Sequence, residues 1–307
     1  MKGDNLFRLC ISNSDEMKRF LIKILVAVVF FFTLIMSVYF VLRFTSSETY
    51  TYDNDYVFVL GDSQIYQGLD VLLLGNRKGK PVLTSAGHGA GIYDFLVNEK
   101  SIPNNATCII AFPECALLRN PMSDYNRTGF ELSCLQSMFR AGCPLGECRR
   151  IANLNRQNIQ YKTAFGNNHS IYPYSDSIVY SEPLAGFCDM FTDEKDYFIW
   201  KAEAYHQGIS QLFKKHNQII LIQFPFEKQV EDCAYNSINR HLTDSLKFNL
   251  IGEYAMKHDT IVLHSDSLLM HDLSHMNEVG ARMLTCQIAD ALIADTVNNR
   301  FFTVVIE

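Results

Sequence analysis

The 307-residue chain lacks several features that would place it in well-known classes of protein. It has no long run of Lys and Arg, only short pairs such as Arg149–Arg150, and its formal net charge is -6. Because phosphate binding needs a concentrated basic patch, this composition speaks against a nucleic-acid partner. No repeat period and no low-complexity tract occurs, so a repeat architecture is not expected.

Metal-ligand spacing is also missing, although the chain has nine cysteines and nine histidines. No pair of cysteines has the C-x-x-C spacing of a zinc site, so we expect no metal and no other cofactor. Cys134, Cys143 and Cys148 cluster in a loop-like region. Export from the cytoplasm would permit disulfides there. The sequence leaves open which cysteines are paired and which are simply buried.

One long uncharged run, ILVAVVFFFTLIMSVYFVL at residues 24–42, dominates the N-terminal part. A helix of this length crosses about 30 Å of hydrocarbon. The alternative is a buried core helix, which so long an uncharged run near the N-terminus disfavours. Five basic residues precede the run and only Arg43 follows it closely. The positive-inside rule therefore keeps residues 1–23 in the cytoplasm and places the chain after about residue 45 outside it, periplasmic or extracellular.

A cleaved signal peptide is the competing interpretation of this run. The run is longer than a typical signal h-region and no A-x-A-like site follows it, so an uncleaved anchor is favoured. No cysteine just past the run suggests a lipoprotein. We predict a transmembrane signal-anchor at 24–43 and a polar linker at 44–55.

Strand and helix patterns alternate over residues 56–307. Apolar runs predict strands at 56–60, 81–86, 106–112, 218–224 and 260–263. Helical spacing predicts helices from 64, from 93, and over 197–216, 244–257 and 278–297. This alternation predicts one α/β domain, a parallel sheet with helices on both faces. The irregular stretch around 115–195 is predicted to be an insertion of long loops.

Ser63 follows the first predicted strand in the sequence Gly61-Asp62-Ser63. At a strand-to-helix turn its hydroxyl would lie at the open end of the sheet, and free N–H groups there could bind developing negative charge. The alternative is a simple helix cap, because Ser and Asp are preferred N-cap residues.

Asp272 and His275 are three residues apart, just before the last predicted helix. A serine nucleophile needs a base to take its proton, and the base needs a carboxylate to fix its tautomer. A turn there would let one side chain reach the other, with Asn277 capping the helix that begins at Glu278. The alternative is that D-x-x-H arises by chance and that the Asp is structural.

Three blocks occur in a defined order: G-D-S after the first strand, a glycine loop (GHGAG, 87–91) after the second, and D-x-S-H-M-N-x-x-G before the last helix. In that order they resemble the SGNH/GDSL hydrolase superfamily. The resemblance implies a three-layer, flavodoxin-like SGNH hydrolase fold. It also implies that Ser63 is the nucleophile, that His275 is the general base and that Asp272 orients it. Gly87 or Gly89 would join the N–H of Ser63 in the oxyanion hole, and Asp62 would lie in the pocket.

The chain departs from the family at its third block, G-x-N-D. The equivalent stretch reads Ala111-Phe-Pro-Glu114, so a proline stands where the family has an asparagine that donates to the oxyanion. His88 and Asn120 are candidate replacements. Anchored members with a loosened third block resemble the branch that acts in O-acylation of cell-surface polysaccharides. That resemblance implies an acylated carbohydrate substrate and a multi-spanning membrane acyltransferase as a partner.

Three functions remain open at this point. The first is a serine esterase or O-acyltransferase that works through an acyl-enzyme at Ser63. The second is a binding or scaffold protein on the same fold with degenerate catalysis, and the third is a lipid-directed esterase. The remaining histidines are expected to be structural, with His206, His216, His241 and His258 on helical surfaces and His264 and His271 beside the motif. Trp200, Tyr197 and Phe198 are expected to pack in the core or a groove.

Overall fold

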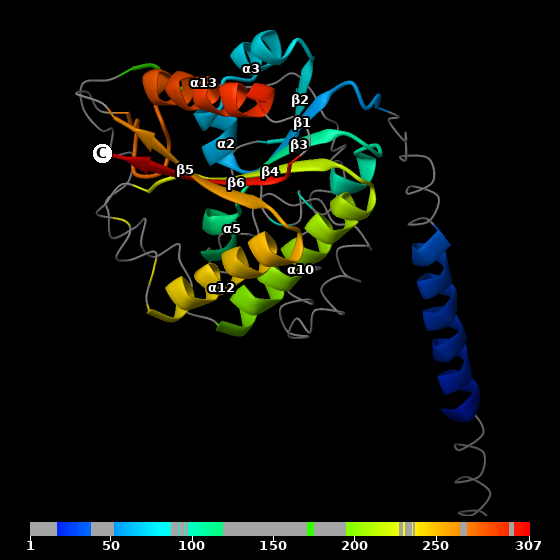
Figure 1. The fold of residues 1–307 in the computed structure, drawn as a ribbon. Coiled ribbons are helices and arrows are strands. Elements are labelled where there is room, and N and C mark those ends of the chain that lie inside the picture. The colour runs from blue at the N-terminus through cyan, green and yellow to red at the C-terminus, as the bar shows by residue number, and fades with distance from the viewer. Residues whose placement is uncertain are drawn as a thin grey trace, which may run out of the picture. The chain divides into compact units, whose positions relative to one another are not determined.

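The computed structural model of this chain describes residues 17–37, 52–86, 98–118, 171–174, 195–226, 237–264, 269–294 and 298–307, together with residues 92, 95, 230 and 235. The chain divides into two compact units, Met1–Thr49 and Tyr50–Glu307 (Figure 1). Residues 1–16 of the predicted cytoplasmic segment 1–23 lie outside the described residues, as do residues 44–51 of the predicted linker.

The described residues of the first unit form the helix Met17–Ser37, whose large apolar side chains are exposed. Within the described part of the chain it is the one helix long and apolar enough to cross a membrane. It begins seven residues before the predicted segment at 24–43 and includes Lys18, Arg19 and Lys23. Residues 38–43 of the predicted segment lie outside the described residues.

The second unit is built on a six-stranded parallel sheet. Its strands are β1 (Val57–Leu60), β2 (Val82–Thr84), β3 (Thr107–Ala111), β4 (Gln218–Gln223), β5 (Lys257–Leu263) and β6 (Arg300–Ile306). They are arranged in the order β2-β1-β3-β4-β6-β5, and every neighbouring pair is parallel. The predicted α/β class and parallel sheet are confirmed.

Helices cover both faces of this sheet, because each central strand is apolar on both sides. Phe58 and Leu60 face a core shared with α5 (Glu114–Leu118), α10 (Lys195–Lys214) and α12 (Ser237–Glu253). Val57 and Val59 face a second core shared with α2 (Ser63–Gly68), α3 (Val71–Lys78) and α13 (Glu278–Ala294). Figure 1 shows these two helical layers on opposite sides of the strands.

Four details of the predicted elements are wrong. The helix predicted from residue 64 is two helices, because the chain breaks at Leu69 and Asp70 caps α3 through its side chain. The predicted helix 244–257 is displaced toward the N-terminus, and its last residue, Lys257, begins β5. His258 therefore lies on a strand, not on a helix. Strand β6 was not predicted at all.

The strand order places the end of β1 at a reversal in the direction of winding. From β1 the chain moves to β2 on one side, and it then returns to β3 on the other side. In open parallel sheets, ligands bind at the carboxyl ends of the strands beside such a reversal. Gly61, Asp62 and Ser63 follow β1 at this point.

Gly61 makes the turn out of β1 possible. Its φ is +148°, and a Cβ built on it would lie 2.6 Å from the Cβ of Ala111 and 2.7 Å from Cγ2 of Ile65. Both the backbone angle and the close approach of β3 exclude a side chain here.

We expect Gly61→Ala to lower the free energy of unfolding by about 2–4 kcal/mol, because it combines backbone strain with overpacking. Chemical denaturation of the full chain in detergent measures this change. Gly252→Ala is the matched control, since its Cβ would meet no atom within 4 Å. That variant is expected to stay within about 1 kcal/mol of the parent. Equal stability of Gly61→Ala and the parent would contradict the steric argument.

Candidate active site

The Ser63 side chain is held at the start of α2. Asp62 is the N-cap of this helix, and its Oδ1 accepts a hydrogen bond from the N–H of Gln64 at 3.0 Å. Ser63 is buried, with 6% of its surface exposed. The predicted pocket residue Asp62 is also buried and acts as a helix cap.

Asp272 and His275 lie in a tight loop between Leu269 and Asn277. The N–H of Asn277 donates to the carbonyl oxygen of Leu269 at 2.9 Å, and Met270 and Met276 form an antiparallel bridge. At the tip, the N–H of His271 donates to the carbonyl oxygen of His275 at 2.7 Å. We call residues 269–277 the His loop.

The first helical turn of α13 closes the His loop. Oδ1 of Asn277 accepts hydrogen bonds from the N–H groups of Val279 and Gly280 at 3.0 and 3.2 Å, so Asn277 caps the helix as predicted. A Cβ on Gly280 would lie 2.7 Å from the carbonyl oxygen of Leu269. The Asn and Gly of the D-x-S-H-M-N-x-x-G block therefore have structural reasons to be there.

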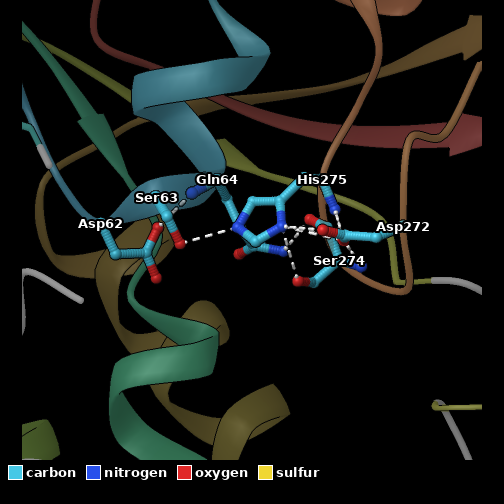
Figure 2. A network of polar contacts seen from close by, with 6 residues as sticks. All are labelled: Asp62, Ser63, Gln64, Asp272, Ser274 and His275. Atoms are coloured by element: carbon cyan, nitrogen blue, oxygen red, sulfur yellow. Dashed lines mark hydrogen bonds and ion pairs between the residues drawn. The ribbon is translucent and has the colours of Figure 1, made fainter. Parts of the chain in front are cut away.

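Ser63, His275 and Asp272 form a continuous hydrogen-bonded chain (Figure 2). Nδ1 of His275 lies 2.8 Å from both carboxylate oxygens of Asp272, and Nε2 lies 2.8 Å from Oγ of Ser63. An ionised carboxylate can only accept, so Nδ1 carries the proton in the neutral ring. Nε2 then accepts the hydrogen bond from the Ser63 hydroxyl.

The Asp272 carboxylate is held in its charged form. Burial acts to raise its pKa, but the hydrogen bond from His275, the charge of His275 and the N–H groups of Ser274 and His275 together lower it below its ordinary value. Both backbone donors lie 2.9 Å from Oδ1. The carboxylate therefore has fixed partners besides the imidazole.

Apolar side chains anchor the His loop in both cores of the sheet. Leu269, Met270 and Met276 are buried in the core under α13, whereas Leu273 is buried in the core on the opposite face. These apolar side chains lie on either side of the polar pairs His271–Asp272 and Ser274–His275 along the loop. The loop is consequently fixed from both sides.

Two polar residues of this network were not predicted. The Nε2 group of Gln64 donates to the carbonyl oxygen of Ser274 at 3.2 Å, which ties α2 directly to the His loop. The hydroxyl of Ser274 lies 3.3 Å from Nδ1 of His275 (Figure 2). Gln64 directly follows Ser63 in the sequence, and Ser274 is the Ser of the D-x-S-H-M-N-x-x-G block, so both had a local sequence signal.

Four predicted residues, Gly87, His88, Gly89 and Asn120, lie outside the described residues. The third block is described: β3 ends at Ala111, and Phe112, Pro113 and Glu114 follow. Both carboxylate oxygens of buried Glu114 accept hydrogen bonds from Nε2 of Gln223, at 2.9 and 3.0 Å. This stretch offers no asparagine amide to a ligand.

The remaining residues considered from sequence are mostly structural. Phe198 and Trp200 are buried in the core, and His264 is exposed beside Glu307. Cys108 and Cys286 are free thiols, whereas the Cys134–Cys148 cluster lies outside the described residues. Among the residues that the structure covers, no group of three His, Cys, Asp or Glu side chains is placed to hold a metal ion.

A comparison of the sequence with known proteins found no matching protein-family model and no matching curated protein.

The lowered pKa of Asp272 predicts how acid affects stability. A carboxyl whose pKa is lower in the folded protein contributes stability above its unfolded pKa of about 4. This contribution is lost as pH falls through the lower pKa of the folded state. We expect Asp272→Asn to cost about 1–3 kcal/mol between pH 5 and 8, with the difference from the parent narrowing in stronger acid.

Thermal unfolding of both full-length proteins from about pH 8 down to strong acid measures the difference in stability. Asp290→Asn is the matched control, because Asp290 pairs with Arg77 at 2.7 Å on the surface and is largely exposed. Its removal is expected to cost less than about 1 kcal/mol. A difference for Asp272→Asn that stays constant down to strong acid would contradict the pKa argument.

Proposed function

We propose that this protein is a serine-dependent esterase or O-acyltransferase of the SGNH/GDSL type, which forms an acyl-enzyme at Ser63. The observation that carries the proposal is the hydrogen-bonded chain from Ser63 through His275 to Asp272. Each side chain has the partner its role requires: a hydroxyl beside a basic nitrogen, and a carboxylate behind the ring.

In the first half of the proposed reaction, Oγ of Ser63 attacks the carbonyl carbon of an ester while Nε2 of His275 takes the hydroxyl proton. The C–O bond to the leaving group then breaks, and His275 returns the proton to the departing alcohol oxygen. The product is an acyl ester on Ser63. Asp272 keeps its charge throughout and stabilises the imidazolium.

The second half regenerates the serine. His275 takes a proton from water or from an acceptor hydroxyl, whose oxygen attacks the acyl carbon. The bond to Ser63 breaks, and the serine oxygen receives the proton back from His275. Water gives hydrolysis and a sugar hydroxyl gives acyl transfer.

The negative charge on the tetrahedral carbon needs hydrogen-bond donors. The amide of Ser63 is at the first residue of α2, where helix geometry leaves the N–H without an intrahelical acceptor. We assign this N–H as one donor, and Gly87 or Gly89 as the source of a second. Asp62 borders the same pocket in this proposal, and His88 or Asn120 replaces the missing third-block asparagine.

The proposed substrate is an acyl ester of a cell-surface carbohydrate. This part rests on the N-terminal helix Met17–Ser37, which supports a single-pass anchor, and on the resemblance to anchored O-acylation proteins. The proposed orientation has the N-terminus in the cytoplasm and the α/β domain outside, beside a multi-spanning membrane acyltransferase. No soluble cofactor takes part in this mechanism.

A second candidate function is a binding or scaffold protein on the same fold. The end of β3 favours it, because Pro113 has no N–H and Glu114 is engaged by Gln223. Losing one oxyanion donor costs a known hydrolase roughly 10²–10³ in rate. A protein of this kind would bind carbohydrate but turn over no ester.

Labelling with a fluorophosphonate and hydrolysis of an activated acetate ester test the enzyme. We expect the full chain in detergent to be labelled at Ser63, and Ser63→Ala to lose labelling and at least about 10³-fold in kcat. Ser245→Ala is the matched control, since this serine lies on α12, on the opposite face of the sheet. It should keep both signals.

Three results would decide between the candidates. The same nonzero turnover in Ser63→Ala and in the parent would overturn the assigned mechanism. Carbohydrate binding without any labelling would select the scaffold. Labelling at Ser63 together with acetate release supports the enzyme. Acetyl ester that appears on an added sugar, at the expense of free acetate, selects transfer.

A further inference from the structure

Tyr172 brings a distant part of the chain to the His loop. It belongs to the short described segment 171–174, within the stretch predicted as an irregular insertion. Its backbone forms a parallel bridge with Asn277, the residue at the C-terminal end of the His loop. Tyr172 is thereby attached to the arm of the loop that follows His275.

The ring of Tyr172 contacts the other arm of the same loop. It stacks on the imidazole of His271, with ring centroids 3.8 Å apart and planes inclined by 10°. His271 directly precedes Asp272. Nδ1 of His271 is buried and has no hydrogen-bond partner among the described residues, and the Tyr172 ring packs on the face of this imidazole.

The same tyrosine ring also lies against the base. The centroids of Tyr172 and His275 are 5.8 Å apart and the planes meet at 62°, an edge-to-face arrangement. Such contacts favour one relative orientation of two rings. Tyr172 therefore touches residues 271, 275 and 277, which precede, include and follow the base.

We infer that Tyr172 is a positioning residue for His275. It joins the two arms of the His loop and limits rotation of the imidazole, which keeps Nε2 at hydrogen-bond distance from Ser63. The inference rests on the proposed function, because it assigns Tyr172 to the orientation of the proposed base. The tyrosine ring performs this role, and its hydroxyl takes no part in it.

Proton transfer needs this control because the hydrogen bond between Nε2 of His275 and Oγ of Ser63 is lost in the acyl-enzyme, where Oγ carries no proton. The carboxylate of Asp272 fixes Nδ1 at a single point. A ring held at one end still swings about that point, and a displacement of about 1 Å at the other end weakens catalysis strongly. Contact with a second ring removes that swing.

Steady-state kinetics of the full chain in detergent give the first test. Tyr172→Ala should lower kcat about tenfold with a smaller change in KM, because an aromatic pair of this kind is lost. Tyr172→Phe keeps the bridge and the ring and should stay within about twofold of the parent. Tyr174→Ala is the matched control, since Tyr174 lies in the same segment and is 45% exposed.

A second measurement reports the geometry without any substrate. In protein labelled with ¹⁵N-histidine, the Nδ1 proton of His275 should give a strongly downfield NMR signal, which His275→Gln identifies by its absence. We expect this signal to persist in Tyr172→Phe and Tyr174→Ala, and to broaden or vanish in Tyr172→Ala. His271→Ala removes the stack but leaves the backbone bridge, and it should weaken the signal in the same direction.

The outcomes separate the two claims. Unchanged kcat and an unchanged Nδ1 signal in both Tyr172→Ala and His271→Ala would overturn the positioning role. If the parent hydrolyses no ester, but its Nδ1 signal is lost in Tyr172→Ala and His271→Ala, the proposed enzyme is refuted and the positioning role is supported. If Tyr172→Ala does not fold, Tyr172→Leu and His271→Ala supply the same comparison.

Discussion

The Asp272 carboxylate can only accept hydrogen bonds, and the geometry of the site follows from that restriction. The carboxylate obliges Nδ1 of His275 to donate, so Nε2 is left to accept from Ser63. Its Oδ1 also accepts hydrogen bonds from the N–H groups of Ser274 and His275, which stabilises a turn of the backbone around the carboxylate. One charged group thus sets the tautomer of the ring and the shape of the loop that carries it.

The two halves of the site start on different strands and meet across the sheet. Ser63 follows β1 and the His loop lies between β5 and α13, with β3, β4 and β6 between these strands. At about 4.8 Å per strand, the ends of β1 and β5 are roughly 19 Å apart. The chain between β5 and α13 spans this distance. Helix α13 packs against α2 and α3, and the side-chain amide of Gln64 donates a hydrogen bond to the carbonyl oxygen of Ser274 in the His loop.

Local patterns predicted the elements well where burial was continuous. Strands such as 218–223 are almost wholly apolar, and the turns at Gly61 and Asn277 carry their own chemical signals. The three-residue spacing of Asp272 and His275 predicted their contact, because a turn before the helix brings the two side chains together. Strand β6 was missed because a helix prediction ran up to it, and α2 and α3 were merged because one apolar spacing continues across the Asp70 cap. Tyr172 had no signal, since its role depends on a tertiary contact with residues about 100 positions away.

Strand β6 has a consequence for how the domain is assembled. It lies between β4 and β5, so the two preceding strands have no direct pairing with each other. Until residues 300–306 have been synthesised, β5 has no neighbouring strand with which to form its hydrogen bonds. Long-range parallel pairing of this kind forms late and slowly. We therefore expect the sheet of the nascent domain to stay open between β4 and β5 until residues 300–306 have been synthesised.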